Sequence, residues 1–225
     1  LNIVFVCPSS YFSGRNIAGL LAKITSFSAK GVFFGRGVPK VVEAAQYKLH
    51  KTVVMVGMMG AGKTAVGRAL ATKLNVPFLD SDAEIEAAAK MTIAEIFDRD
   101  GEAFFRDREA EVINRLLESQ PGILSTGGGA FLAERNRVNI TEKGVAVWLN
   151  ADLNLLWGRV KHKDTRPLLR TANPYATLRD LYRERVPHYE TADLRVMAQP
   201  GLSLDEMASR VVDTLLTRAD VLEVA

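Results

Sequence analysis

The chain has almost no cysteine and no long hydrophobic run, and both absences narrow its class. The single cysteine, Cys7, cannot form a disulfide within the chain, which excludes a disulfide framework and favours a reducing compartment. No apolar run approaches the length of a membrane span, since even residues 145–149 read as a short buried strand. Hydrophobic residues make up 48% and charged residues 24% of the chain, ordinary values for a globular protein. We therefore expect no membrane partner.

Acidic residues are nearly absent from the first fifty positions. Residues 1–50 hold six Lys or Arg and one acid, Glu43, whereas residues 51–225 hold 23 basic and 25 acidic residues. The net charge of +3 therefore comes from the N-terminal segment. Nothing in the remainder predicts a nucleic-acid partner, because no basic stripe or patch stands out there.

The segment 1–50 is interpreted as a basic N-terminal extension. It is rich in Ser, Gly and Phe and poor in acids, traits that resemble an organelle transit peptide. Two alternatives stay open: an upstream stretch wrongly joined to the coding frame, or an extension with no role. Residues 41–49 are compatible with a short helix that leads into the first strand. No motif in this segment carries chemistry.

Residues 57–64 read GMMGAGKT, a complete G-x-x-x-x-G-K-[ST] phosphate-binding loop. An apolar run at 52–56 precedes it and an amphipathic stretch at 65–74 follows, so the loop lies between an expected strand and an expected helix. Its glycines let successive backbone amides point at phosphate oxygens, and the helix presents its positive end to the anion. The lysine should reach the β- and γ-phosphates, and the threonine should ligate Mg²⁺. The sequence therefore predicts a nucleoside triphosphate site formed by Gly57, Gly60, Ala61, Gly62, Lys63, Thr64 and Ala65.

Short strand signals alternate with helical stretches through the main part of the chain. The expected strands are 53–56, 77–79, 123–125, 145–149 and 194–197. This alternation predicts an α/β fold with a parallel sheet covered on both faces by helices. We expect one domain over residues 51–218, followed by a frayed tail over 219–225. Ligands of such sheets bind beyond the carboxyl ends of the strands.

Three helix starts carry capping signals. Thr92 with Glu95, and Ser203 with Glu206, each form a capping-box pattern in which hydroxyl and carboxylate satisfy unpaired amides. Asp152 is expected to cap the helix that follows residues 145–149.

Asp80-Ser81-Asp82 follows the second expected strand. An N-cap and turn would explain one of these acids, but not both so near a phosphate-binding loop. Asp80 is predicted to hold a water of the Mg²⁺ shell, since Mg²⁺ keeps several waters and takes few direct carboxylates. Asp82 is predicted to bind substrate hydroxyls and to receive the proton of the attacking hydroxyl.

Arg106 and Glu109 stand three residues apart on an expected helix. The pair could be a helix-surface ion pair of small energetic value. The planar guanidinium of Arg106 also suits bidentate capture of a carboxylate, so the residue is a candidate for substrate binding.

Gly127, Gly128 and Gly129 follow the third expected strand. Consecutive glycines are costly in chain entropy, so a plain turn would seldom use them. They are typical of a backbone that must approach a ligand closely and offer bare N–H groups.

A polar loop punctuated by prolines spans residues 162–175, between two expected helices. A loop of this length inside a compact domain is commonly a lid. Arg166 is predicted to fold over the phosphates and stabilise transition-state charge, although a solvated loop arginine is the simpler alternative. Further along, His188 is expected to be a surface or packing residue, because no Ser, Cys or metal partner has matching spacing.

Taken in order, these motifs resemble the shikimate kinase family. The elements are GMMGAGKT, DSD, FRDRE, TGGG, DTRPLL and RVPHYETAD, and the match spans about residues 51–196. The resemblance implies a three-layer α/β/α sandwich with a central parallel sheet, of the P-loop kinase type. It also implies ATP-dependent phosphorylation of the 3-hydroxyl of shikimate, with Mg²⁺, on the route to chorismate and the aromatic amino acids.

The same resemblance assigns roles residue by residue. Substrate binding falls to Asp82, Arg106, Gly127, Gly128, Gly129 and Arg185, with the two arginines on the carboxylate. Lys63, Asp82 and Arg166 are the implied catalytic residues. Arg159 matches the arginine that packs near adenine in relatives, and Arg166 also contacts nucleotide. Thr64 and Asp80, the latter through water, are the implied metal ligands.

Two rival functions stay open at this point. One is another small-molecule kinase of the same fold, such as a gluconate kinase, which the glycine triplet and the Arg106/Arg185 pair disfavour. The other is a catalytically silent shikimate-kinase-like binding module, which would typically lack substrate-site residues that are present here. We expect a monomer in the bacterial cytoplasm, with a plastid-type organelle as the alternative if residues 1–50 are a transit peptide.

Overall fold

A five-stranded parallel sheet forms the centre of the fold. The computed structural model describes residues 46–162 and 167–225. The sheet order is β3-β4-β2-β5-β6, and every neighbouring pair is parallel. The strands are β2 (Thr52–Val56), β3 (Phe78–Asp80), β4 (Ile123–Ser125), β5 (Gly144–Asn150) and β6 (Leu194–Met197). All five strands lie within about a residue of the ranges predicted from sequence, and the predicted α/β fold is confirmed.

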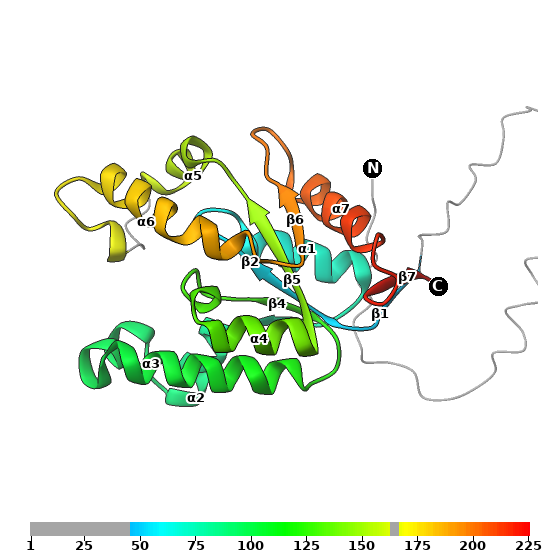
Figure 1. Ribbon diagram of the computed structural model, residues 1–225, viewed down its shortest axis with the longest axis horizontal. Helices are drawn as coiled ribbons and strands as arrows, with labels where there is room; N and C mark the ends of the chain where they lie inside the picture. The colour runs from blue at the N-terminus through cyan, green and yellow to red at the C-terminus, as the bar shows by residue number, and fades with distance from the viewer. Residues whose placement is uncertain (1–45, 163–166) are drawn as a thin grey trace, which may run out of the picture. The chain divides into compact units, whose positions relative to one another are not determined.

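Helices cover both faces of this sheet (Figure 1). The connection from β2 to β3 crosses the sheet in one direction, and the connection from β4 to β5 crosses it in the other. Because both crossovers are expected to be right-handed, the helices that they contain, α1 and α4, lie on opposite faces. Accordingly α1 packs beside α7, and α4 packs beside α3. The helices are α1 (Lys63–Leu74), α2 (Ser81–Ala89), α3 (Ile93–Leu117), α4 (Glu134–Lys143), α5 (Leu153–Val160), α6 (Pro174–Tyr189) and α7 (Leu204–Leu215), with short 3₁₀ turns η2 (Ala130–Leu132) and η3 (Pro167–Leu169).

The core lies between the sheet and these helices. Strands β2 and β5 are buried at every position, which is why both read as continuous apolar runs without alternation. The three predicted caps are present, since Thr92, Asp152 and Ser203 each accept a hydrogen bond from a backbone amide of their helix. Among the described residues, no helix is both long and apolar enough to cross a bilayer.

A second, two-stranded sheet joins the two ends of the described domain. Strand β1 (Tyr47–Leu49) pairs antiparallel with β7 (Leu222–Val224), and Ala225 donates its amide to the carbonyl of Gln46 at 2.8 Å. The prediction of a frayed tail at 219–225 is therefore wrong. The prediction of a short helix over 41–49 is also wrong for Tyr47–Leu49, which form a strand. Residues 41–45 lie outside the described part. The domain boundary moves from residue 51 to include β1.

Burial explains why the C-terminal strand is ordered. Val221 and Leu222 are 0% and 1% exposed, and both belong to the main core. Around them, Asp220 pairs with Lys51 at 2.8 Å and with Arg218 at 2.7 Å on the surface. Exposed pairs of this kind contribute little, so the apolar side chains hold the strand.

We expect Leu222→Ala to lower the free energy of unfolding by about 2–5 kcal/mol, because it leaves a cavity in a closed core. Urea unfolding followed by circular dichroism measures this value. Val224→Ala is the matched control on the same strand: Val224 is 61% exposed, and its loss should change stability by about 0.5 kcal/mol or less. Equal effects of the two substitutions would contradict the role assigned to β7.

Candidate active site

The phosphate-binding loop connects β2 to α1 at the carboxyl edge of the sheet. Gly62 is the N-cap of α1 and has φ +101°, a left-handed conformation that a side chain would strain. Lys63 and Thr64 are the first two residues of the helix, so their side chains start where the backbone amides are unpaired. The ammonium of Lys63 donates to the carbonyl oxygens of Gly57 and Met58 at 2.8 and 3.2 Å. The loop therefore holds its own lysine over the space that the helix terminus faces.

Arg159 reaches this loop from α5. Its guanidinium donates to the carbonyls of Gly60 and Ala61 at 3.2 and 3.0 Å. Because the two residues lie almost a hundred positions away from it in sequence, this contact fixes the outer rim of the phosphate-binding loop to α5. Arg166, the predicted lid arginine, lies outside the described residues.

Hydroxyl and carboxylate oxygens from two strand ends and the start of α1 meet beside the loop. The hydroxyl of Thr64 lies 3.4 Å from Asp80 Oδ2 and 3.1 Å from the hydroxyl of Ser125. Asp80 is also the N-cap of α2, because its Oδ1 accepts from the amide of Asp82 at 3.1 Å. The capping role and the role near the phosphate loop are thus carried by different oxygens of one carboxylate. Ser125 was not predicted as a site residue. The signal that could have indicated it is its position at the end of a strand, because ligands bind beyond such ends.

Asp82 lies on the first turn of α2 and faces the glycine triplet. A Cβ added to Gly127 would come within 2.9 Å of Asp82 Oδ1 and 3.3 Å of Glu109 Oε1. Burial, and secondarily the negative charge of Asp80, raise the pKa of Asp82, while Lys63 lowers it. A carboxylate with a raised pKa beside a cationic loop is typical of a proton acceptor at a reacting group.

Arg106 is held by two carboxylates of its own helix. It pairs with Glu109 at 2.9 Å and with Glu102 at 3.1 Å. The alternative of a helix-surface pair is wrong for Glu109, which is 1% exposed and keeps its Oε1 buried with no partner among the described residues. Burial raises the pKa of Glu109, and Arg106 opposes that rise. The ion pair is therefore part of the site, not of the solvated surface.

The glycine triplet lets the backbone pass close to this arginine. A Cβ on Gly129 would come within 2.7 Å of the Arg106 guanidinium, so a side chain at this position would displace the arginine. Gly128 faces another arginine, Arg185 of α6, whose guanidinium would lie 3.6 Å from an added Cβ. Three residues that are separate in sequence, Asp82, Arg106 and Arg185, are thereby brought around one loop.

Arg185 is the least exposed of the site's arginines that the structure describes. It is 8% exposed, and its Nε is buried without a hydrogen-bond partner among the described residues. A buried guanidinium that is not fully satisfied is costly unless an anion completes it. The position is thus suited to an acidic ligand.

One cavity of about 600 Å³ connects the phosphate-binding loop to the glycine triplet. Asp80, Asp82 and Arg159 contribute polar groups to its wall. An apolar part of its lining was missed from sequence, because the residues come from the β6–α7 connection and the first turn of α7 and carry no motif. These residues are Ala198, Leu202, Leu204 and Met207.

A phosphate-binding loop at the switch point of a parallel sheet, with a second polar subsite in the same cavity, defines a P-loop protein that binds a nucleotide and a small acidic molecule. The family model described as shikimate kinase matches residues 59–216. The chain belongs to the shikimate kinase family.

Bacterial shikimate kinases are similar in sequence to this chain over most of its length. A shikimate kinase of Ruegeria pomeroyi is 67% identical over 186 residues, covering 83% of this chain and 95% of the relative. A shikimate kinase of Cereibacter sphaeroides is 65% identical over 176 residues, covering 78% of this chain and 88% of the relative.

Solved structures give the same class. A shikimate kinase from Acinetobacter baumannii, in complex with shikimate, superposes with a TM-score of 0.70 at 39% identity, covering 74% of this chain and 93% of that one. The shikimate kinase of Aquifex aeolicus superposes with a TM-score of 0.66 at 31% identity, covering 75% and 98%. A gluconokinase from Sinorhizobium meliloti, at 18% identity and a TM-score of 0.53, shares the fold alone.

Proposed function

We propose that this chain transfers the γ-phosphoryl group of ATP to the 3-hydroxyl of shikimate, giving ADP and shikimate 3-phosphate. The observation that carries the proposal is the grouping of Asp82, Arg106 and Arg185 around the glycine triplet, whose Gly127 and Gly128 line the cavity that also contains the phosphate-binding loop. A small polyhydroxylated acid requires guanidinium groups for its carboxylate and a carboxylate for its hydroxyls. The identity to shikimate kinases supports the same substrate.

Each proposed role follows from position. Arg106 and Arg185 bind the substrate carboxylate, and Gly128 and Gly129 present backbone amides to it. Asp82 holds the attacking hydroxyl and accepts its proton. Positioning and charge stabilisation account for most of the rate of phosphoryl transfer, so the covalent contribution of the protein is small.

Two cations of the chain are proposed to act on the phosphates. Lys63 binds the β- and γ-phosphate oxygens from the start of α1. Arg166 stabilises the transferring group from the predicted lid, a role that rests on the sequence motif.

The donors around Thr64 fit a magnesium ion. The Thr64 hydroxyl lies 3.1 Å from the Ser125 hydroxyl and 3.4 Å from the Asp80 carboxylate, and all three are hard oxygen ligands, the type that Mg²⁺ prefers. We propose that Thr64 ligates the ion and that Asp80 holds it through water. When bound, Mg²⁺ neutralises charge on the β- and γ-phosphates.

ADP release in the presence of ATP, Mg²⁺ and shikimate tests the function, beside gluconate and a control without acceptor. We expect turnover that depends on shikimate and is absent with gluconate. ATP binding without shikimate turnover would favour the silent binding module, and turnover with gluconate would favour the rival kinase. The bacterial relatives favour the bacterial cytoplasm over a plastid-type organelle. A monomer is proposed, to be tested by light scattering.

Arg106→Ala should raise the KM for shikimate about 10- to 100-fold, the value of charge-assisted hydrogen bonds to a carboxylate. The Kd for ATP, measured by titration calorimetry, should stay within about twofold. Arg108→Ala is the matched control, because Arg108 lies on the same helix, is half-exposed and pairs with Glu111 at 2.6 Å. An equal loss of ATP affinity, or an equal effect of Arg108→Ala, would contradict the assigned contact.

A further inference from the structure

Hydrogen bonds to its carbonyl groups hold the backbone of the glycine triplet and of the turn that follows it. Each carbonyl from residue 127 to residue 132 accepts a hydrogen bond. Gly127 and Gly129 accept from the amides of Ala130 and Leu132, both at 3.1 Å. The other four carbonyls accept from side chains: Gly128 from Tyr189, Ala130 from Asn136, and Phe131 and Leu132 from Arg137. With the carbonyls fixed outward, the amides of Gly128 and Gly129 have no acceptor among the described residues.

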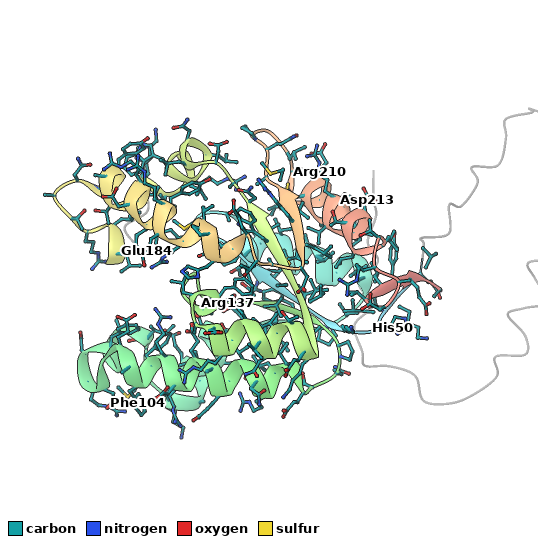
Figure 2. The ribbon with its side chains drawn as sticks, viewed as in Figure 1. His50, Phe104, Arg137, Glu184, Arg210 and Asp213 are labelled. Atoms are coloured by element: carbon teal, nitrogen blue, oxygen red, sulfur yellow. The ribbon has the colours of Figure 1, made fainter. Side chains whose placement is uncertain are left out.

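The supporting side chains come from α4 and α6. Asn136 is 1% exposed and donates at 2.8 Å. Arg137 lies on the side of α4 that faces α6, 3.5 Å from His188 Nδ1 (Figure 2). Tyr189 is the last residue of α6, so its bond to Gly128 joins two elements that are 61 residues apart. Of these anchors, Tyr189 is the one whose partner is a glycine assigned to the substrate.

Tyr189 is rigid and stays a donor. It is 0% exposed, and its ring stacks between Phe131 and Trp148 with centroid distances of 6.5 and 6.2 Å. Its hydroxyl lies 2.5 Å from the Gly128 carbonyl oxygen. Burial raises the pKa of Tyr189 to about 12, so the phenol keeps its proton throughout the physiological range.

Arg185 lies beside the same glycine. Tyr189 and Arg185 are one helical turn apart on α6, and the positive charge of Arg185 partly offsets the rise in the pKa of Tyr189. Arg185 in turn faces Gly128, where an added Cβ would lie 3.6 Å from its guanidinium. The Tyr189 hydroxyl and the Arg185 guanidinium therefore both approach Gly128, from neighbouring turns of one helix.

We propose that Tyr189 is a positioning residue for the acceptor substrate, whose hydroxyl holds the Gly128 backbone beside the Arg185 guanidinium. The inference rests on the proposed function, because it takes Arg185 and Gly128 as ligands of the substrate carboxylate. Without the hydroxyl, the Gly128 carbonyl loses a short hydrogen bond, and the Gly128 backbone is no longer held beside the Arg185 guanidinium. This change loosens the acceptor subsite and leaves the phosphate-binding loop untouched.

Tyr189→Phe tests this, because the ring and its stacking are retained. We expect the KM for shikimate to rise about 5- to 10-fold, with kcat and the Kd for ATP within about twofold of wild type. Tyr182→Phe is the control: Tyr182 is half-buried on the same helix, and its hydroxyl makes no hydrogen bond to the described residues. If Tyr189 had a purely structural role, Tyr189→Phe would lower the melting temperature and would change the KM for shikimate and the Kd for ATP by similar factors.

A double-mutant cycle with Arg185→Lys separates this inference from the proposed function. If Tyr189 acts by holding Gly128 beside Arg185, Tyr189→Phe should add less than about twofold to the KM of Arg185→Lys. Full additivity would overturn the inference while leaving the role of Arg185 intact. A normal KM for Arg185→Lys would instead contradict the proposed carboxylate contact. Methyl shikimate, which lacks the carboxylate charge, provides a second test on the single variant. The rise in KM caused by Tyr189→Phe should be smaller with methyl shikimate than with shikimate.

Discussion

Asp82→Asn should lower kcat by about 10²- to 10⁴-fold, the usual contribution of a positioned proton acceptor. The amide keeps the size and a carbonyl oxygen for hydrogen bonding, but it cannot take the proton of the attacking hydroxyl. The KM for shikimate should therefore change far less than kcat. Steady-state ADP release, with quenched single turnover to isolate the chemical step, measures the effect. A kcat within tenfold of wild type would rule out Asp82 as the base.

The same substitution should stabilise the protein at neutral pH. The pKa of Asp82 is raised above its ordinary value of 3.8, so the folded state favours the protonated form. Its favourable contribution is complete below pH 3.8 and is lost as the pH rises through the raised pKa. At pH 7–8 the buried charge destabilises the fold, and an uncharged amide removes that penalty.

Thermal unfolding at two pH values tests this sign. The melting temperature of Asp82→Asn should exceed that of wild type at pH 8, by about 2–4 °C for each kcal/mol gained, and the difference should shrink towards pH 4. Asp213→Asn is the control, since Asp213 is exposed on α7 (Figure 2). A lower melting temperature for Asp82→Asn at pH 8 would show that the ionised carboxylate stabilises the site.

Local signals explain what could be predicted from the sequence. The phosphate-binding loop, the capping boxes and the five strands depend on neighbouring residues, so pattern and spacing were sufficient. The β1–β7 pairing depends on contact between Leu49 and Leu222 at opposite ends of the domain, and three-residue strands carry too little pattern to indicate a partner. The error about the C-terminal tail follows from this.

Burial explains what could not be predicted in the site. Spacing placed Arg106 and Glu109 on one face of a helix, but it could not show that Glu109 would be 1% exposed while the side chain of Glu111 on the same helix is 58% exposed. The glycine triplet was interpreted as a close approach to ligand. The structure adds that it first makes room for the protein's own Arg106 and Asp82. Neither fact is encoded in neighbouring residues.

Lys63→Met should lower kcat by about 10²- to 10³-fold, as expected when one preorganised cationic donor is removed from a developing charge. Methionine keeps most of the stem, so the start of α1 should remain formed. The affinity for shikimate, measured by titration calorimetry, should stay within about twofold. Lys73→Met is the control on the same helix, where Lys73 pairs with Asp205 on the surface at 3.0 Å. Equal losses in the two variants would contradict the assigned role.

The lysine should also change the pH dependence of the residual activity. Its positive charge lowers the pKa of Asp82, against burial and the charge of Asp80. Removing that charge raises the pKa of Asp82 further, and the proposed mechanism requires Asp82 ionised. The acidic limb of the kcat profile should therefore move to higher pH in Lys63→Met, and stay in place in Lys73→Met. An unshifted limb would mean that the two groups act independently, so that Lys63 serves the phosphates alone.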